Sequence, residues 1–169
     1  MPTNKIVTHH PGLFFNPFEN NIMQPAEIVS LYNRDLYKLI EEISLFQREE
    51  NLWKTSGHIH NPAGNLALHI TGGLNHHIGA TVAGNGYIRN RDLEFTQKDI
   101  KRENILDGLR QLVILVDQTL AGITTEQWLS AFPAYFDKDN ATHEYVITQL
   151  LLHLNYHLGQ INYLRRMLE

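Results

Sequence analysis

The sequence contains no cysteine. This absence excludes disulfide bonds, thiolate catalysis, cysteine-ligated zinc sites and iron–sulfur clusters together. Long hydrophobic runs are also missing, since no stretch reaches the length of a transmembrane helix. Residues 1–11 lack the basic and apolar regions of a signal peptide. We therefore expect a cytoplasmic protein that does not enter a membrane.

Strong charge of either sign is absent as well. A net charge of −4 gives no basic surface of the kind that binds nucleic acid or anionic membranes. The composition, 43% hydrophobic and 19% charged, is that of an ordinary globular protein, and 169 residues suit a single domain covering the whole chain, 1–169. We expect the partner to be a small molecule. The unusual feature of the composition is histidine, with ten copies whose positions carry the functional argument below.

Apolar residues recur at steps of three and four in four long segments, which predicts an all-α protein built as a four-helix bundle. The expected second helix begins between residues 62 and 65 and ends between residues 84 and 86, and the other three cover about residues 25–49, 98–120 and 141–167. A capping box at Thr124 predicts a short helix ending at Leu129. Residues 85–97 and 131–140 are expected to be loops. Residues 1–24 are expected to form an irregular, phenylalanine-rich arm packed on the bundle.

Three histidines lie on the predicted apolar stripes. His153 and His157 are four residues apart, which places both imidazoles on one face of the last helix. His69 lies on the stripe of the second helix, so the three converge if these helices are neighbours. A metal ion satisfies the ring nitrogens and keeps positions open for substrate, as in catalytic sites. Nickel, zinc, iron and manganese all remain candidates, and a hydrogen-bonded histidine core is the alternative.

Other metal motifs are missing. No Glu-x-x-His occurs, which argues against a carboxylate-bridged di-iron bundle. His143-Glu144 is not followed by the second histidine of a zincin helix. The three-histidine site is therefore the metal site that the sequence favours.

Several residues near the predicted site have two interpretations each. His76 follows His69 by two turns and is a candidate proton shuttle or substrate contact, or else a structural histidine. Gln160 is expected to hydrogen-bond a ligand histidine or to pack between helices. Gly72-Gly73 indicates either open space beside the metal or close packing. No carboxylate is well placed as a base, and the roles of the remaining candidates stay open: His58, His60, His77, Arg89 and Arg91.

Two segments together resemble the DinB-like (DinB/YfiT-type) family of metal-binding four-helix bundles. They are Gly-Asn-Leu-Ala-Leu-His at residues 64–69 and His-Leu-Asn-Tyr-His-Leu-Gly-Gln at residues 153–160. The resemblance covers about residues 25–168. It implies an up-down-down-up bundle, a frequent homodimer, and a divalent metal ion held by the residues that match the family's three histidines, His69, His153 and His157.

Activity varies within that family, so the resemblance indicates the site more firmly than the reaction. It implies a thiol S-transferase in which the metal activates a low-molecular-weight thiol cosubstrate. A metal-dependent hydrolase is one alternative, with His76 as its candidate base. A non-catalytic metal or small-ligand binding protein is another, and a purely structural bundle is a third.

Overall fold

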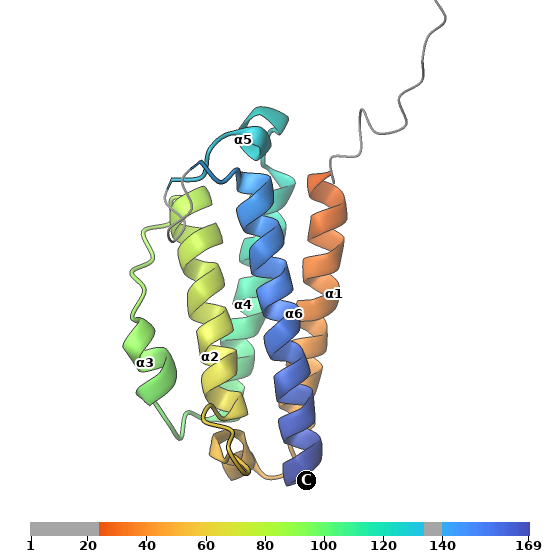
Figure 1. Cartoon of the computed structure of the whole chain (residues 1–169), viewed down its shortest axis with the longest axis vertical. Coiled ribbons are helices and arrows are strands. Elements are labelled where there is room, and N and C mark those ends of the chain that lie inside the picture. The colour runs from red at the N-terminus through yellow and green to blue at the C-terminus, as the bar shows by residue number, and fades with distance from the viewer. Residues whose placement is uncertain (1–23, 134–139) are drawn as a thin grey trace, which may run out of the picture.

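The chain folds as a bundle of four long helices (Figure 1). The computed structural model describes residues 24–133 and 140–169, and the expected N-terminal arm lies outside them except for Gln24. The long helices are α1 (Pro25–Ser44), α2 (Ala63–Leu74), α4 (Arg102–Ala121) and α6 (His143–Leu168), and η2 (Asn75–Val82) continues α2. The short ones are η1 (Glu49–Trp53), α3 (Arg91–Thr96) and α5 (Thr125–Leu129). The described residues contain no strand, only an isolated bridge between Ala131 and Thr142. The predicted all-α class is confirmed.

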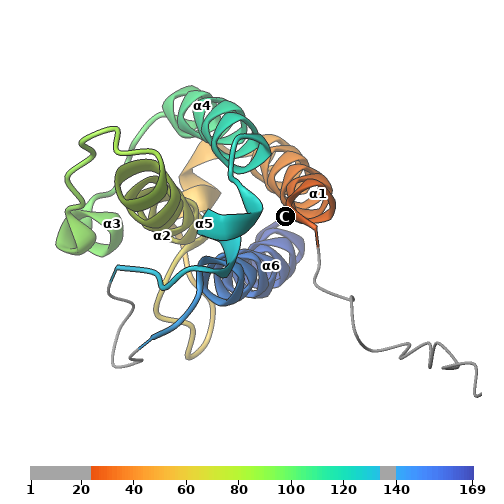
Figure 2. The same ribbon diagram turned by 90° about the horizontal axis from the view of Figure 1, so that it is seen from above.

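The four long helices surround one apolar core. α1 packs against α4 and α6, and α2 packs against the same two helices from the opposite corner (Figure 2). α1 and α6 run in one direction and α2 and α4 in the other, which is the expected up-down-down-up order (Figure 1). None of the described helices is long and apolar enough to cross a membrane. Because α2 and α6 are direct neighbours, side chains on their facing stripes can meet.

Local capping explains where most helices begin. Pro25 opens α1, and Gln24 and Glu27 form a capping box there. The hydroxyl groups of Thr124 and Thr142 accept hydrogen bonds from backbone N–H groups at the starts of α5 and α6. The predicted starts of the first, short and last helices are therefore confirmed within one or two residues.

Two predicted helix boundaries are wrong. The first helix was expected to reach residue 49, but α1 ends at Ser44 and Phe46 turns into the core, 1% exposed. The guanidinium of Arg102 donates to the carbonyl of Phe46, which satisfies a group that the helix would otherwise have used. The third helix was expected from residue 98, but Asp99 adopts a left-handed conformation with φ of 58°, so α4 begins at Arg102.

The second helix follows the prediction in extent but not in its buried face. Its final part, η2, is π-helical, with Ala83 donating to the carbonyl of Ile78 five residues earlier. A π turn contains more residues than an α turn, so the apolar stripe drifts. His76 follows His69 by two turns in the expected helix, whereas His77 and Ile78 are the buried residues in the structure. Gly84 and Gly86 then turn the chain with φ of 66° and 76°, as glycine allows.

Candidate metal centre

The three predicted histidines come together between α2 and α6. The Nε2 atom of His153 lies 3.0 Å from Nε2 of His69 and 3.2 Å from Nε2 of His157. The candidate ligand atoms of the three residues all lie within 4.8 Å of one another. Imidazole nitrogens bound at about 2.1 Å to one ion are separated by roughly 3 Å when they are adjacent ligands. The cluster therefore has the dimensions of a three-histidine site that can hold a metal ion.

The hydrogen bonds at the far side of two rings fix their tautomers. Nδ1 of His69 lies 2.8 Å from Oε2 of Glu94, and Nδ1 of His157 lies 2.7 Å from Oε1 of Gln160. Both oxygens are acceptors, so we infer that each Nδ1 carries the proton and each Nε2 presents a lone pair. Nη2 of Arg89 also lies 3.3 Å from Nδ1 of His69, but its shorter contact, 2.8 Å, is with Oε2 of Glu94. Two lone pairs thus point toward Nε2 of His153. A metal ion satisfies all three nitrogens, whereas one N–H of His153 would have to serve both acceptors.

Burial keeps the three imidazoles neutral. Desolvation lowers the pKa of His69 and of His157, and hydrogen bonds to Glu94 and Gln160 oppose it only in part. Desolvation, followed by the neighbouring rings and the cation Arg89, lowers the pKa of His153 to about 4. A neutral imidazole is the form that binds a metal ion, so the site is ready for one at neutral pH.

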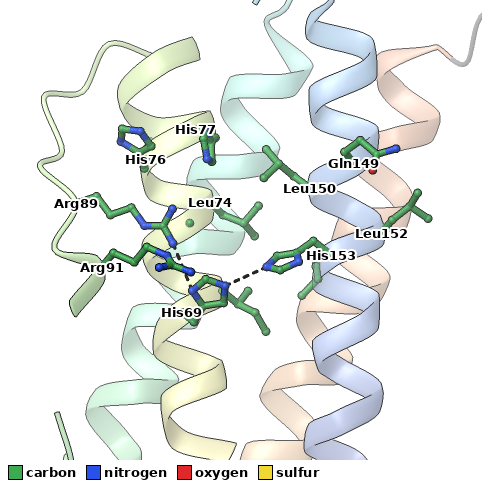
Figure 3. A pocket seen from close by; sticks show the side chains of 13 residues that line it. His69, Leu74, His76, His77, Arg89, Arg91, Gln149, Leu150, Leu152 and His153 are labelled. Atoms are coloured by element: carbon green, nitrogen blue, oxygen red, sulfur yellow. Dashed lines mark hydrogen bonds between the residues drawn. The ribbon is translucent and has the colours of Figure 1, made fainter. Parts of the chain in front are cut away.

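His153 differs from the other two in its exposure. It was expected to face the core with the rest of the apolar stripe of the last helix. His157 is only 8% exposed, as predicted, but His153 stands at the exposed edge of that stripe. Its ring reaches across the gap between α2 and α6 toward His69 (Figure 3). The cluster is consequently closed on one side and open on the other.

Glu94 is the residue that sequence reasoning missed. The segment 85–97 was expected to be a loop without a well-placed carboxylate, but it contains α3, which lies against the outer side of α2 (Figure 2). The carboxylate of Glu94 is buried at 5% exposure and accepts hydrogen bonds of 2.7 and 2.8 Å from Arg89. Desolvation alone would raise its pKa, but hydrogen bonds from Arg89 and His69 outweigh it and lower the pKa.

Asn65 and Gly72 fix α3 in place. The amide of Asn65 donates to the backbone carbonyls of Glu94 and Gln97, both at 2.8 Å. A Cβ atom on Gly72 would lie 2.8 Å from Cδ of Glu94 and closer still to its Oε1. Gly72 therefore provides close packing, which was one of its two interpretations, although the packed group is a carboxylate rather than a bundle helix. Asn90 caps α3 by accepting from the N–H of Leu93, the local signal that could have revealed this helix.

A cavity of about 570 Å³ opens beside the cluster, on the side of His153 (Figure 3). Its size is typical of a small-molecule site. The predicted candidates His76, Arg89 and Arg91 lie on its wall, as does His77. His76 is half-buried, and its Nδ1 atom has no hydrogen-bond partner among the described residues.

The remaining histidine candidates lie elsewhere. His60 borders a second cavity of about 580 Å³ with Tyr156, Gln160 and Tyr163, and His58 is exposed in the preceding turn. Gln160 thus separates this second cavity from the histidine cluster. Its hydrogen bond to His157 agrees with the expectation that it contacts a ligand histidine.

The comparisons with known proteins give one family. A search of the curated proteins finds no match. Residues 29–169 match the family model described as a protein of unknown function, DUF1572. This match includes all four long helices except the first turn of α1, together with the three histidines and Glu94. The chain therefore belongs to the DUF1572 family.

Proposed function

We propose that His69, His153 and His157 hold a divalent metal ion in a DinB-like bundle, and that the protein is a metal-dependent enzyme. The observation that carries this proposal is the convergence of three Nε2 atoms, two of them with fixed lone pairs, beside an open cavity. A structural metal site would be closed by a fourth protein ligand, whereas this cluster has three histidines and is open toward the cavity.

The reaction that we favour is thiol S-transfer. A divalent ion at such a site lowers the pKa of a thiol that it binds and orients the resulting thiolate. The absence of cysteine fits a thiol supplied by a cosubstrate. His76 and His77 line the cavity at a level beyond His69 and are in position to contact a bound molecule (Figure 3).

Metal-dependent hydrolysis is the second candidate, and it needs a general base. Glu94 does not serve, because its two oxygens are already engaged by Arg89 and His69 and its pKa is lowered. His76 is the candidate that remains, because its Nδ1 has no hydrogen-bond partner in the described part of the chain. Non-catalytic metal or ligand binding is the third candidate and predicts retained metal without turnover.

Metal content is the first measurement. Protein purified without an affinity tag is analysed by inductively coupled plasma mass spectrometry, beside His153→Ala and the matched control His58→Ala. We expect about one ion per chain in the wild type and the control, and loss of the ion in His153→Ala. No ion after exposure to nickel, zinc, iron and manganese would contradict the proposal and favour a hydrogen-bonded histidine core.

Turnover then separates the candidate functions. The metal-loaded protein is incubated with an electrophile or an ester, with and without low-molecular-weight thiols. Thiol-dependent product without net hydrolysis supports the transferase, and thiol-independent hydrolysis supports the second candidate. A loaded protein that turns over neither substrate class would favour a binding protein.

The homodimer expected from the resemblance stays a prediction. Exposed apolar side chains follow one face of α6: Leu152, Tyr156, Tyr163 and Met167. Their spacing of four, seven and four residues places the four side chains on one side of the helix, where a second helix could pack. Light scattering on wild type and on Tyr163→Glu tests whether this face joins two copies.

A further inference from the structure

The wall of the 570 Å³ cavity is positively charged in a protein that is negatively charged overall. Among the residues that the structure describes, its lining includes two arginines and no aspartate or glutamate, while the whole chain carries a net charge of −4. Arg89 and Arg91 both come from the segment that leads into α3, and both extend toward His69 (Figure 3). Cavities lined by charge of one sign concentrate ligands of the opposite sign.

The two arginines are not equivalent. The guanidinium of Arg89 forms a bidentate pair with Glu94, so its charge is balanced inside the protein. Among the described residues, no carboxylate lies within ion-pair distance of Arg91. Its guanidinium instead stands 5.5 Å from the centre of the Phe95 ring, which holds it at the cavity wall. Arg91 is therefore the cation whose hydrogen-bond donors remain available to a ligand.

The opposite part of the cavity is apolar. Leu74 from α2 and Leu150 and Leu154 from α6 line it, and each is buried at 6% exposure or less. His69 and His153 of the histidine cluster line the same cavity as these leucines and Arg91 (Figure 3). A ligand that fills the cavity would thus meet a cation, an apolar surface and the cluster.

We propose that the cavity binds a small organic carboxylate, whose charged group pairs with Arg91 and whose apolar body lies against Leu74 and Leu150. One unpaired guanidinium matches one negative charge, which favours a monocarboxylate over a dianion. This inference names the substrate class of the proposed enzyme and rests on that function only for the reaction. Carboxylate binding by Arg91 requires no metal.

A binding experiment tests the pairing directly. Full-length protein, either metal-loaded or treated with EDTA, is titrated with 3-phenylpropionate and with its neutral amide at constant ionic strength, using ligand-observed NMR. The variant is Arg91→Gln. The matched control is Arg166→Gln, because Arg166 is an exposed cation 5.9 Å from the ring centre of Tyr163 and lies outside the cavity lining.

We expect the wild type to bind the acid about tenfold more tightly than the amide, as one charged hydrogen-bonded pair provides. Arg91→Gln should abolish that preference, Arg91→Lys should restore part of it, and Arg166→Gln should leave it unchanged. If Arg91→Gln does not fold, the preference of the EDTA-treated wild type, compared with Arg91→Lys, is decisive. Equal binding of acid and amide would overturn the proposal.

The metal-free arm separates this inference from the proposed function. Arg91-dependent binding to EDTA-treated protein, together with a failure to bind any metal, would support the carboxylate site and contradict the proposed metal-dependent enzyme. Binding that needs the metal and ignores Arg91→Gln would mean that the carboxylate is a metal ligand, and it would overturn the assignment of Arg91.

Discussion

Each of the two buried imidazoles is oriented by one acceptor. Glu94 holds Nδ1 of His69, and Gln160 holds Nδ1 of His157. No acceptor in the described part of the chain holds Nδ1 of His153, the exposed member. Outer hydrogen bonds of this kind fix ring orientation and raise the basicity of a ligand nitrogen. The cluster thus combines two fixed imidazoles with one that is freer to adjust.

Glu94→Gln should weaken metal binding. The substitution keeps the size of the side chain but replaces the carboxylate, which accepts a hydrogen bond from His69 and balances the charge of Arg89, by a neutral amide. We expect the affinity for the metal to fall about 10- to 100-fold, the usual effect of losing such a partner. Competition with a chromogenic chelator measures the affinity. Glu103→Gln, at an exposed carboxylate on α4, is the control, and an equal loss in both variants would contradict the role of Glu94.

Gln160→Ala should disturb the His157 ring, whereas Gln160→Glu should leave it as in the wild type. Alanine removes the acceptor for Nδ1 of His157, so the ring is released and populates both tautomers. Glutamate keeps an acceptor at the same distance along the side chain. We expect nitrogen NMR to show an Nδ1-protonated ring in the wild type and in Gln160→Glu, and a mixture in Gln160→Ala. Metal affinity should fall about tenfold in the alanine variant alone.

At the scale of elements, the short helix α3 matters most for the site, because it packs on α2 and supplies Glu94. It lies outside the four long helices, and it contributes Glu94 to the cluster. Its six residues are too few to hold a helix by local propensity, so its place depends on contacts with α2. Asn65 supplies hydrogen bonds for that contact and Gly72 supplies the space.

Gly72→Ala and Gly73→Ala provide a matched test of that contact. An added Cβ at Gly72 meets the carboxylate of Glu94, which hydrogen bonds to His69 and Arg89 hold in place, whereas one at Gly73 comes no closer than 3.6 Å to Arg89. We expect Gly72→Ala to lower the free energy of unfolding by about 1–3 kcal/mol, as overpacking does. Gly73→Ala should raise it by roughly 0.5–1 kcal/mol, since alanine favours the helix. Urea denaturation measures both, and equal effects would contradict the packing argument.

The elements also show what a sequence can predict. Helix periodicity and caps such as Thr142 are local signals, so the four long helices and most of their starts were predictable. The spacing of His153 and His157, together with the adjacency of α2 and α6, likewise suggested the cluster. The role of Glu94 depends on its tertiary contact with His69, which is 25 residues away in the sequence. The burial of His77 depends on a local change from α-helix to π-helix. Neither leaves a periodic signal.

At the scale of the whole molecule, the bundle buries histidines in their neutral form, and His77 is the one whose pKa is lowered most clearly outside the metal cluster. His77 is 8% exposed between the cavity and the ring of Phe132, and Arg89, His76 and His153 are its charged or titratable neighbours. Desolvation, aided by these neighbours, lowers its pKa from 6.5 to about 4. Such a group couples the stability of the whole fold to pH.

The metal-free protein should lose stability as the pH falls from about 6.5 to about 4, and His77 should account for part of the loss. In that interval the unfolded chain binds a proton at His77 that the folded chain does not, so the contribution of His77 to the free energy of unfolding decreases as pH decreases and changes no further below 4. A shift of this size corresponds to a loss of about 3 kcal/mol at most. Urea denaturation between pH 4 and pH 7.5 on EDTA-treated protein measures the slope. His77→Gln should flatten it and the exposed control His58→Gln should not, while an unchanged slope in His77→Gln would show that other groups carry the dependence.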